Sequence, residues 1–164
     1  MKIVYIGLGS NLNQPWCRLV QGLSLISKIS GVRVLACSRV YRSQPMGPKQ
    51  PDFLNAVCRI AVERCPDGLL TALQAIERQQ GRLLTRVHWG PRPLDLDILW
   101  WQGCVMRSNR LTLPHPGCWQ RLFVLFPWLD VCQHDPELNQ RVRACAIFSN
   151  SKLLGPGRFI SGWL

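Results

Sequence analysis

The pattern of hydrophobic and polar positions predicts strands and helices along most of the chain. Runs rich in Val, Ile, Ala and Cys are typical of strands, and apolar residues at every third or fourth position are typical of helices. On this basis we expect strands at residues 2–9, 32–41, 53–63, 94–101 and 110–113. We expect helices at residues 14–30, 66–81 and 120–129, the first two closed by glycines and the last interrupted by Pro127.

Two loops rich in proline separate these elements. Residues 42–52 hold three prolines and should form a stiff connection between two strands. Residues 82–93 are basic and contain Gly90 and two prolines, so we expect a mobile loop there.

The order of the elements predicts an α+β fold. Strand, helix, strand, strand, helix, strand with antiparallel pairing is the ferredoxin-like arrangement β-α-β-β-α-β, in which helices pack on the sheet as three layers, α/β/α. The length suits a single domain over residues 1–164. From about residue 133 the sequence is weakly patterned, and this tail is basic, with Arg141, Arg143, Lys152 and Arg158.

Composition narrows the choice of partners and compartment. Twenty Lys and Arg against nine Asp and Glu give a formal net charge of +11, which predicts attraction to nucleotides, nucleic acids or acidic membrane surfaces. The eight cysteines are scattered without a CxxC pair, and the apolar run after Met1 is too short for a secretory signal. We therefore expect reduced thiols, a cytoplasmic location and no association with membrane.

The sharpest chemical feature is the pair Asp95 and Asp97. A period of two places both aspartates on one strand face and, on the other, Leu94, Leu96, Ile98 and Trp100. Neighbouring carboxylates repel each other unless a hard cation lies between them, and Mg²⁺ is the natural candidate. The alternative is that both aspartates form ion pairs with arginines.

Basic and aromatic residues surround this pair along the sequence. Arg82, Arg86 and Arg92 could grip phosphate oxygens, although most such charge runs are solvated loops. His115 could donate a hydrogen bond to a phosphate or serve a structural role. Phe53 and Asn55 face the same way on a strand and would suit a planar heterocycle with amide-like edges, although Phe in a strand is usually a core residue. A dicarboxylate beside a basic loop favours phosphoryl-group transfer.

Six motifs, in this order, resemble the 6-hydroxymethyl-7,8-dihydropterin pyrophosphokinase family. They are Gly9-Ser10-Asn11-Leu12, Tyr41-Arg42-Ser43, Pro51-Asp52-Phe53-Leu54-Asn55, Glu77-Arg78-Gln79-Gln80-Gly81-Arg82, Trp89-Gly90-Pro91-Arg92-Pro93-Leu94-Asp95-Leu96-Asp97 and Leu113-Pro114-His115-Pro116. The resemblance covers roughly residues 1 to 130. It implies transfer of pyrophosphate from ATP to the hydroxymethyl group of a dihydropterin for folate biosynthesis, with AMP as the leaving group.

The resemblance also implies roles for individual residues. Asp95 and Asp97 would hold two Mg²⁺ ions, and Arg82, Arg92 and His115 would contact the ATP phosphates. The nucleotide site would be lined or supported by Gln74, Glu77, Trp89, Ile98, Arg110, Thr112 and Arg121. The pterin ring would lie between Phe53 and Phe123, with Asn55 at its edge and the backbone of Ser43 and Met46 completing the site.

Two alternatives remain open from the sequence. The net charge would also suit a nucleic-acid-binding ferredoxin-like module, although paired carboxylates would repel RNA. Leu84 and His88 stand where members of the family commonly have arginines. The second alternative is therefore a pterin- or nucleotide-binding relative that has lost activity. For the enzyme we expect a monomer with ATP and the hydroxymethyldihydropterin as its partners and no binding of nucleic acid.

Overall fold

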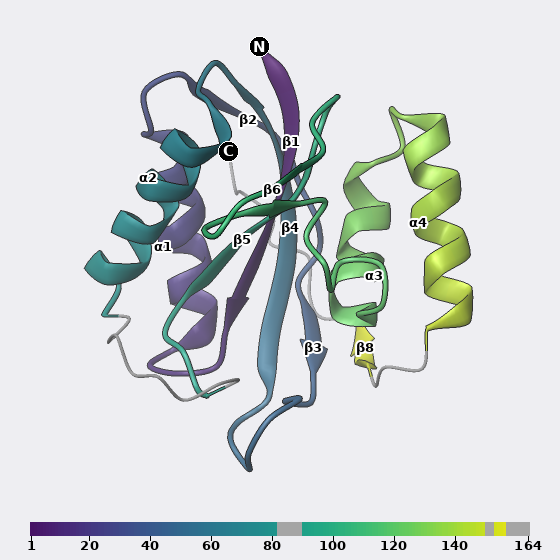
Figure 1. Cartoon of the computed structure of the whole chain (residues 1–164). Helices are drawn as coiled ribbons and strands as arrows, with labels where there is room; N and C mark the ends of the chain where they lie inside the picture. The colour runs from purple at the N-terminus through teal and green to yellow at the C-terminus, as the bar shows by residue number, and fades with distance from the viewer. Residues whose placement is uncertain (82–89, 150–152, 157–164) are drawn as a thin grey trace.

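The computed structural model describes residues 1–81 and 90–149 and the backbone of residues 153–156. The strands are β1 (Lys2–Ser10), β2 (Val32–Cys37), β3 (Tyr41–Ser43), β4 (Phe53–Val62), β5 (Asp95–Trp101), β6 (Met106–Arg107), β7 (Thr112–Leu113) and β8 (Leu153–Pro156). The helices are α1 (Pro15–Ser27), α2 (Pro66–Gln79), α3 (Leu122–Val131) and α4 (Pro136–Phe148). Figure 1 shows their arrangement.

An antiparallel sheet forms the centre of the molecule. Its strand order is β5-β1-β4-β3-β8, and β2 pairs with β4 beside β3. Helices α1 and α2 cover one face, α3 covers the other, and α4 packs on the outer side of α3 (Figure 1). The alternation along β1 explains both contacts, because Val4, Ile6 and Leu8 belong to the core under α1 and α2 while Tyr5 belongs to the core under α3 and α4. The expected three-layer α+β fold is confirmed.

The expected strand at residues 32–41 is in fact two strands. Ser38 stands between β2 and β3, and its hydroxyl oxygen accepts the backbone N–H of Val57 at 2.9 Å. Its own backbone N–H donates to the Val57 carbonyl. A side chain therefore replaces a backbone partner in the ladder, and the chain leaves regular strand geometry there.

The expected position of Trp100 was wrong. The pairing of β5 with β1 shifts by one residue, so Ile98 lies opposite Ile6 but Trp100 lies opposite Tyr5. Trp100 packs edge-on against the Tyr5 ring, with centroids 5.8 Å apart, on the face covered by α3 and α4. A bulge of this kind inverts the alternation beyond it, which an unbroken period of two cannot predict.

The C-terminal part is more regular than its sequence pattern suggested. Pro127 lies inside α3 and does not interrupt it, because Leu125, Trp128 and Val131 are buried against the sheet and hold the helix together. Helix α4 occupies the weakly patterned region, and the Asp135 carboxylate caps its first turn by accepting the backbone N–H of Leu138 at 3.0 Å.

All eight cysteine thiols are free in the structure. In the part of the chain that the structure describes, none of the helices combines the length and apolarity that crossing a membrane requires.

The Asp130 carboxylate, near the end of α3, connects this helix to the start of β3. The Asp130 side chain accepts hydrogen bonds from the Arg39 backbone N–H, from the Arg39 guanidinium and from the Tyr41 hydroxyl, at 2.6 to 3.1 Å. Burial, followed by the nearby Asp130 charge, raises the pKa of Tyr41 to about 12. The Tyr41 hydroxyl therefore stays protonated and remains a donor.

Replacing Asp130 by alanine should lower the free energy of unfolding by about 2 kcal/mol, because it leaves a partly buried hydroxyl and N–H without their charged acceptor. Urea denaturation would measure this loss. Asp67→Ala is the matched control, since Asp67 lies 3.7 Å from the Arg110 guanidinium at an exposed site and such pairs contribute less than about 1 kcal/mol. Equal losses in the two variants would contradict the role assigned to Asp130.

Candidate functional site

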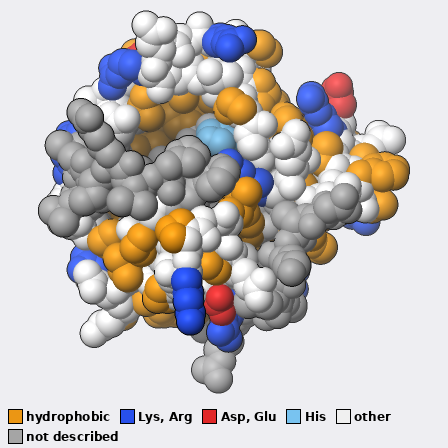
Figure 2. Space-filling view, turned by 60° about the horizontal axis from the view of Figure 1, so that its bottom comes forward, with side chains coloured by type: hydrophobic (Ala, Val, Ile, Leu, Met, Phe, Trp, Pro, Cys, Tyr) orange, Lys and Arg blue, Asp and Glu red, His pale blue; other side chains and the backbone are white. Residues whose placement is uncertain are grey.

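Two neighbouring cavities open on the α3 side and the α2 side of β5. The first encloses about 320 Å³ between β1, β3, β4, β5 and α3. The second encloses about 340 Å³ between α2, β5 and the segment around β7. Asp97 and His115 line both cavities, so this pair of side chains forms the boundary between them. Figure 2 shows a hollow on this face of the molecule with a histidine and a basic side chain at its wall.

Most of the predicted site residues line one of these cavities. The first is lined by Ser43, Met46, Phe53, Asn55, Arg92, Asp95, Asp97, His115, Arg121 and Phe123. The second is lined by Gln74, Glu77, Asp97, Ile98, Arg110, Thr112 and His115. Arg121, expected with the nucleotide contacts, lines the first cavity instead. Arg82 and Trp89, together with Leu84, Arg86 and His88, lie outside the described residues.

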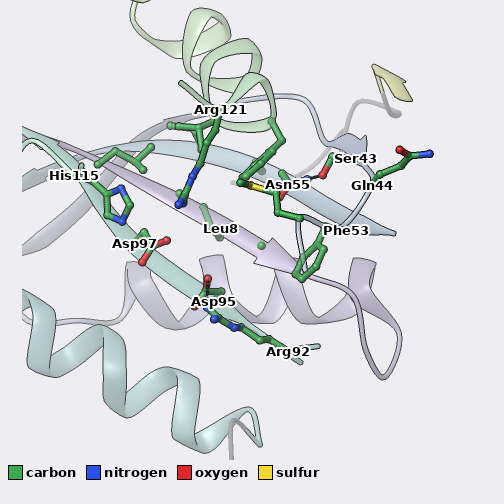
Figure 3. Close-up of a pocket in the computed structure, with 18 of the residues that line it drawn as sticks. Leu8, Ser43, Gln44, Phe53, Asn55, Arg92, Asp95, Asp97, His115 and Arg121 are labelled. Atoms are coloured by element: carbon green, nitrogen blue, oxygen red, sulfur yellow. Dashed lines mark hydrogen bonds and ion pairs between the residues drawn. The ribbon is translucent and has the colours of Figure 1, made fainter. Parts of the chain in front are cut away.

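The two aspartates on β5 point toward the first cavity, as Figure 3 shows. Arg92 donates from Nη1 to Asp95 Oδ2 at 2.8 Å, so the alternative of an ion pair holds for Asp95. None of the described residues donates a hydrogen bond to the Asp97 carboxylate. Burial, and then the Asp95 and Glu77 charges, raise the pKa of Asp97 to about 7. The ionised form of Asp97 is therefore unfavourable in the ligand-free protein, and a bound cation would favour it.

Glu77 has a supporting position beneath the site. This α2 residue is 4% exposed, and its Oε1 accepts the backbone N–H of Leu96 at 2.7 Å. It thereby joins α2 to the strand that carries both aspartates, and its charge adds to the repulsion felt at Asp97.

The two aspartates of β5 suit the way in which proteins usually bind Mg²⁺. Among residues 1–81 and 90–149, no group of three His, Cys, Asp or Glu side chains gathers closely enough to hold a metal. Mg²⁺ is usually bound through one or two carboxylates, with the remaining positions filled by water and substrate phosphate oxygens. Asp95 and Asp97 meet that requirement.

His115 is oriented by its backbone and by one ring nitrogen. Its backbone N–H donates to the Leu99 carbonyl at 2.9 Å, and its Nδ1 accepts the Gly117 N–H at 3.1 Å. An Nδ1 that accepts leaves the proton of the neutral ring on Nε2. Burial, and then the Arg121 charge, lower the pKa of His115. The ring is therefore neutral at neutral pH, with Nε2–H available as a donor.

Arg121 depends on a glycine for its position. It directly precedes α3 and lines the first cavity, and Figure 3 shows it on the side of the cavity opposite Asp95. A Cβ atom at Gly117 would come within 2.6 Å of the Arg121 guanidinium. The absent side chain at residue 117 leaves the space in which this cation lies.

Asn55 is held so that its oxygen stays free for a ligand. Its Nδ2 donates to the Ser43 hydroxyl at 2.9 Å and to the Tyr41 carbonyl at 3.3 Å. Both amide hydrogens are therefore used within the protein. The Oδ1 atom lies beside Gly9, 3.7 Å from where a Cβ would stand, and it can accept from an N–H at the edge of a heterocycle.

The second cavity is more polar. Besides the predicted residues, Ser108 and Asn109 line it. Arg110 donates from Nη2 to the Thr71 hydroxyl at 3.1 Å and lies 3.7 Å from Asp67. These contacts hold a cation at the rim of the cavity, with about half of its side chain exposed.

Sequence reasoning missed the floor of the first cavity, which is formed by Gly7, Gly9 and Leu99, and also Gln44 at its edge. A Cβ at Gly9 would lie 3.7 to 4.0 Å from Asn55, Asp95 and Phe53. Glycines at alternate positions of β1 were a usable signal, because an interior strand glycine often marks the close approach of a ligand.

Comparisons with known proteins point to one enzyme family. A sequence model of the family described as 7,8-dihydro-6-hydroxymethylpterin-pyrophosphokinase (HPPK) matches residues 5–133. The chain is 44% identical to the 2-amino-4-hydroxy-6-hydroxymethyldihydropteridine pyrophosphokinase of Haemophilus influenzae, covering 80% of this chain and 82% of that protein. It is 38% identical to the protein of the same name from Pseudomonas aeruginosa, covering 93% and 97%.

Longer proteins contain a similar region. The chain is 45% identical to the folic acid synthesis protein fol1 of Schizosaccharomyces pombe, covering 93% of this chain but only 23% of that protein. A crystal structure of an HPPK-DHPS in complex with substrates has the same fold, with a TM-score of 0.65 at 10% identity, covering 89% of this chain and 43% of that one.

Proposed function

This chain belongs to the 7,8-dihydro-6-hydroxymethylpterin-pyrophosphokinase family, and from that premise we propose that it transfers pyrophosphate from ATP to the hydroxymethyl group of 6-hydroxymethyl-7,8-dihydropterin. The family and the enzyme class, a diphosphotransferase of folate biosynthesis, are those predicted from the motifs. ATP as the donor, Mg²⁺ as the cofactor and the roles of single residues are the finer parts of the proposal.

One observation carries the proposal: the two cavities meet at Asp97 and His115. The first cavity combines Phe53, for stacking, with the free oxygen of Asn55, which suits the pterin. The second, polar cavity suits the nucleoside part of ATP. A pterin hydroxymethyl group and an ATP phosphate chain that enter from opposite sides would therefore meet at this boundary.

The residues of the chain position the reaction. Asp95 and Asp97 would hold Mg²⁺, which would neutralise the phosphate charge as the reaction proceeds. Arg92 and His115 Nε2–H donate to phosphate oxygens, and Phe53 and Asn55 orient the ring. The hydroxymethyl oxygen forms a bond to the β-phosphorus and loses its proton to solvent, while the bond from that phosphorus to the α,β-bridging oxygen breaks and AMP leaves with this oxygen.

The test is formation of AMP from ATP and Mg²⁺ that depends on the dihydropterin, followed by chromatography. We expect AMP and the pterin diphosphate in equal amounts, and neither product from a variant with alanine at residues 95 and 97. ATP binding without AMP would indicate an inactive relative. Failure to bind ATP would favour the nucleic-acid-binding alternative.

A further inference from the structure

The segment that connects β7 to α3, residues 114–121, carries two polar side chains of the first cavity. These are His115 near its start and Arg121 at its end. Gly117 lies between them, and its carbonyl accepts the backbone N–H of Gln120 at 3.4 Å in a turn. Gly117 itself lines neither of the two cavities. It can therefore affect a substrate only through the residues that it contacts.

The Arg121 guanidinium lies directly against Gly117. A Cβ atom at residue 117 would stand 2.6 Å from the Cζ and Nε atoms of Arg121 and 2.8 Å from its Nη2 atom. Among the described residues, none forms a hydrogen bond or an ion pair with this guanidinium. Because no such bond fixes the charge, its place depends on the open space over Gly117.

A methyl group at residue 117 would move the Arg121 side chain and leave the backbone in place. The Arg121 carbonyl accepts the N–H groups of Val124 and Leu125 at 2.9 Å, so the first turn of α3 holds this part of the backbone. The guanidinium, at the far end of a flexible side chain, can avoid the methyl group by adopting another rotamer. Gly117 is not among the glycines with a positive φ, so its backbone accepts alanine without strain. Alanine would therefore displace a charge at little cost in stability.

The N–H group of Gly117 makes a second contact, which alanine retains. It donates to His115 Nδ1 at 3.1 Å and so keeps the proton of the neutral ring on Nε2. Glycine and alanine have the same N–H group, but only glycine leaves room for the guanidinium. The change from glycine to alanine therefore separates the position of Arg121 from the orientation of His115.

We propose that Gly117 is a positioning residue of the reaction, whose missing side chain lets the Arg121 guanidinium lie at the wall of the first cavity opposite Asp95, where it meets the transferring phosphate (Figure 3). A cation in this place stabilises the negative charge of the phosphate oxygens as the bond to AMP breaks. The role of Gly117 rests on the proposed function, since it assumes that phosphate is transferred in this cavity.

Steady-state kinetics in two backgrounds test whether Gly117 acts through Arg121. Gly117→Ala should lower kcat by about 10 to 10²-fold, since displacement by about 1 Å can cost about 10²-fold. The KM for the dihydropterin should change by less than about threefold, because residue 117 does not line the cavity. In a chain that already carries Arg121→Ala, the same substitution should change kcat by less than about twofold, because the group that it displaces is absent.

Nuclear magnetic resonance of the ligand-free protein measures the position of the side chain without any reaction. The Arg121 Nε–H signal is identified by its absence from the spectrum of Arg121→Ala, and it should shift in Gly117→Ala. The ¹⁵N signals of the His115 ring, recorded at about pH 8 where the ring is neutral, should keep the pattern of a proton on Nε2. The urea midpoint of Gly117→Ala should stay at or above that of the original chain.

The role of Gly117 would be overturned, with the enzyme assignment intact, by an unchanged kcat in Gly117→Ala, by an equal loss of kcat in both backgrounds or by an Arg121 signal that does not move. A changed tautomer of His115, or a lower urea midpoint that the double variant does not restore, would show that alanine disturbs the turn itself and would overturn it as well.

Calorimetric titration with Mg²⁺ and α,β-methylene ATP, which cannot transfer its pyrophosphate, checks the proposed function separately. We expect the original chain to bind this nucleotide and to form AMP from ATP. If it does neither, the proposed function fails, and the role of Gly117 in the reaction fails with it even where the Arg121 signal moves.

Discussion

Replacing Asp97 by asparagine should lower kcat by at least about 10³-fold while making the ligand-free protein more stable. The loss of rate corresponds to about 4 kcal/mol of transition-state stabilisation, because it removes a carboxylate that we propose holds Mg²⁺ at the transferring phosphate. The gain in stability follows from burial and from the repulsion of Asp95 and Glu77, which raise the pKa of Asp97 to about 7. Steady-state kinetics and urea denaturation measure the two effects in one preparation.

The same shift of the Asp97 pKa makes stability depend on pH in a defined direction. Between about pH 4 and about pH 7 the folded protein holds a proton on Asp97 that the unfolded chain has released. The free energy of unfolding of the ligand-free protein should therefore fall as the pH rises through this window. Asp97→Asn should remove that part of the slope. Asp67→Asn is the control, because Asp67 is exposed and is not among the charges that raise the pKa of Asp97.

An unchanged rate in Asp97→Asn, within about tenfold, would contradict the assignment of this carboxylate to the metal. A fall in stability would contradict the account of its uncompensated charge. The two measurements can fail independently, so each tests a separate part of the argument.

Replacing Gly9 by leucine should lower kcat/KM for the dihydropterin by about 10² to 10³-fold and change the affinity for ATP much less. The added side chain would fill the space between Phe53, Asn55 and Asp95, since a Cβ at Gly9 already lies within 4.0 Å of each. Displacement of a bound substrate by about 1 Å can cost about 10²-fold. The second cavity is not lined by Gly9 and should keep its shape.

Gly9→Ala is the matched control for that experiment. Its Cβ would make only ordinary van der Waals contacts, the nearest at 3.7 Å from Asn55 Oδ1, so kcat/KM should change by no more than about threefold. Titration of both variants with α,β-methylene ATP would check that the nucleotide side is intact. Equal pterin kinetics in Gly9→Leu and the original chain would show that the ring does not lie over this glycine.

The sequence predicted the parts of the site that depend on local periodicity. Alternation along β5 placed Asp95 and Asp97 on one face, and alternation along β4 placed Phe53 and Asn55 together; all four line the first cavity. Local periodicity failed where long-range contacts decide the structure. The shift beside Leu99 is set by pairing with β1, and the hydrogen bond from the Arg92 backbone N–H to the Asn11 side chain joins residues 81 positions apart.

The C-terminal helix shows a different limit. Helix α4 buries only Leu138 and Val142, so its apolar stripe is too narrow to stand out as periodicity. Its start was nevertheless visible, because Asp135 followed by Pro136 and Glu137 is a typical beginning of a helix. Capping residues were the better signal in this segment.

Helix α3 gives the protein an internal optical probe of its substrate cavity. Phe123 and Val124 in its first turn line the first cavity, while Trp128, one turn after Val124 on the same face, is fully buried. The Trp128 indole stacks on Trp119 with centroids 5.2 Å apart, and its N–H meets no acceptor among the described residues. Emission from such an apolar site lies at short wavelength, so loosening of this helix would shift to longer wavelength the contribution that Trp128 makes to the emission of the seven tryptophans. Opening of the cavity wall can therefore be followed by light, without a label, while circular dichroism reports whether the sheet stays folded.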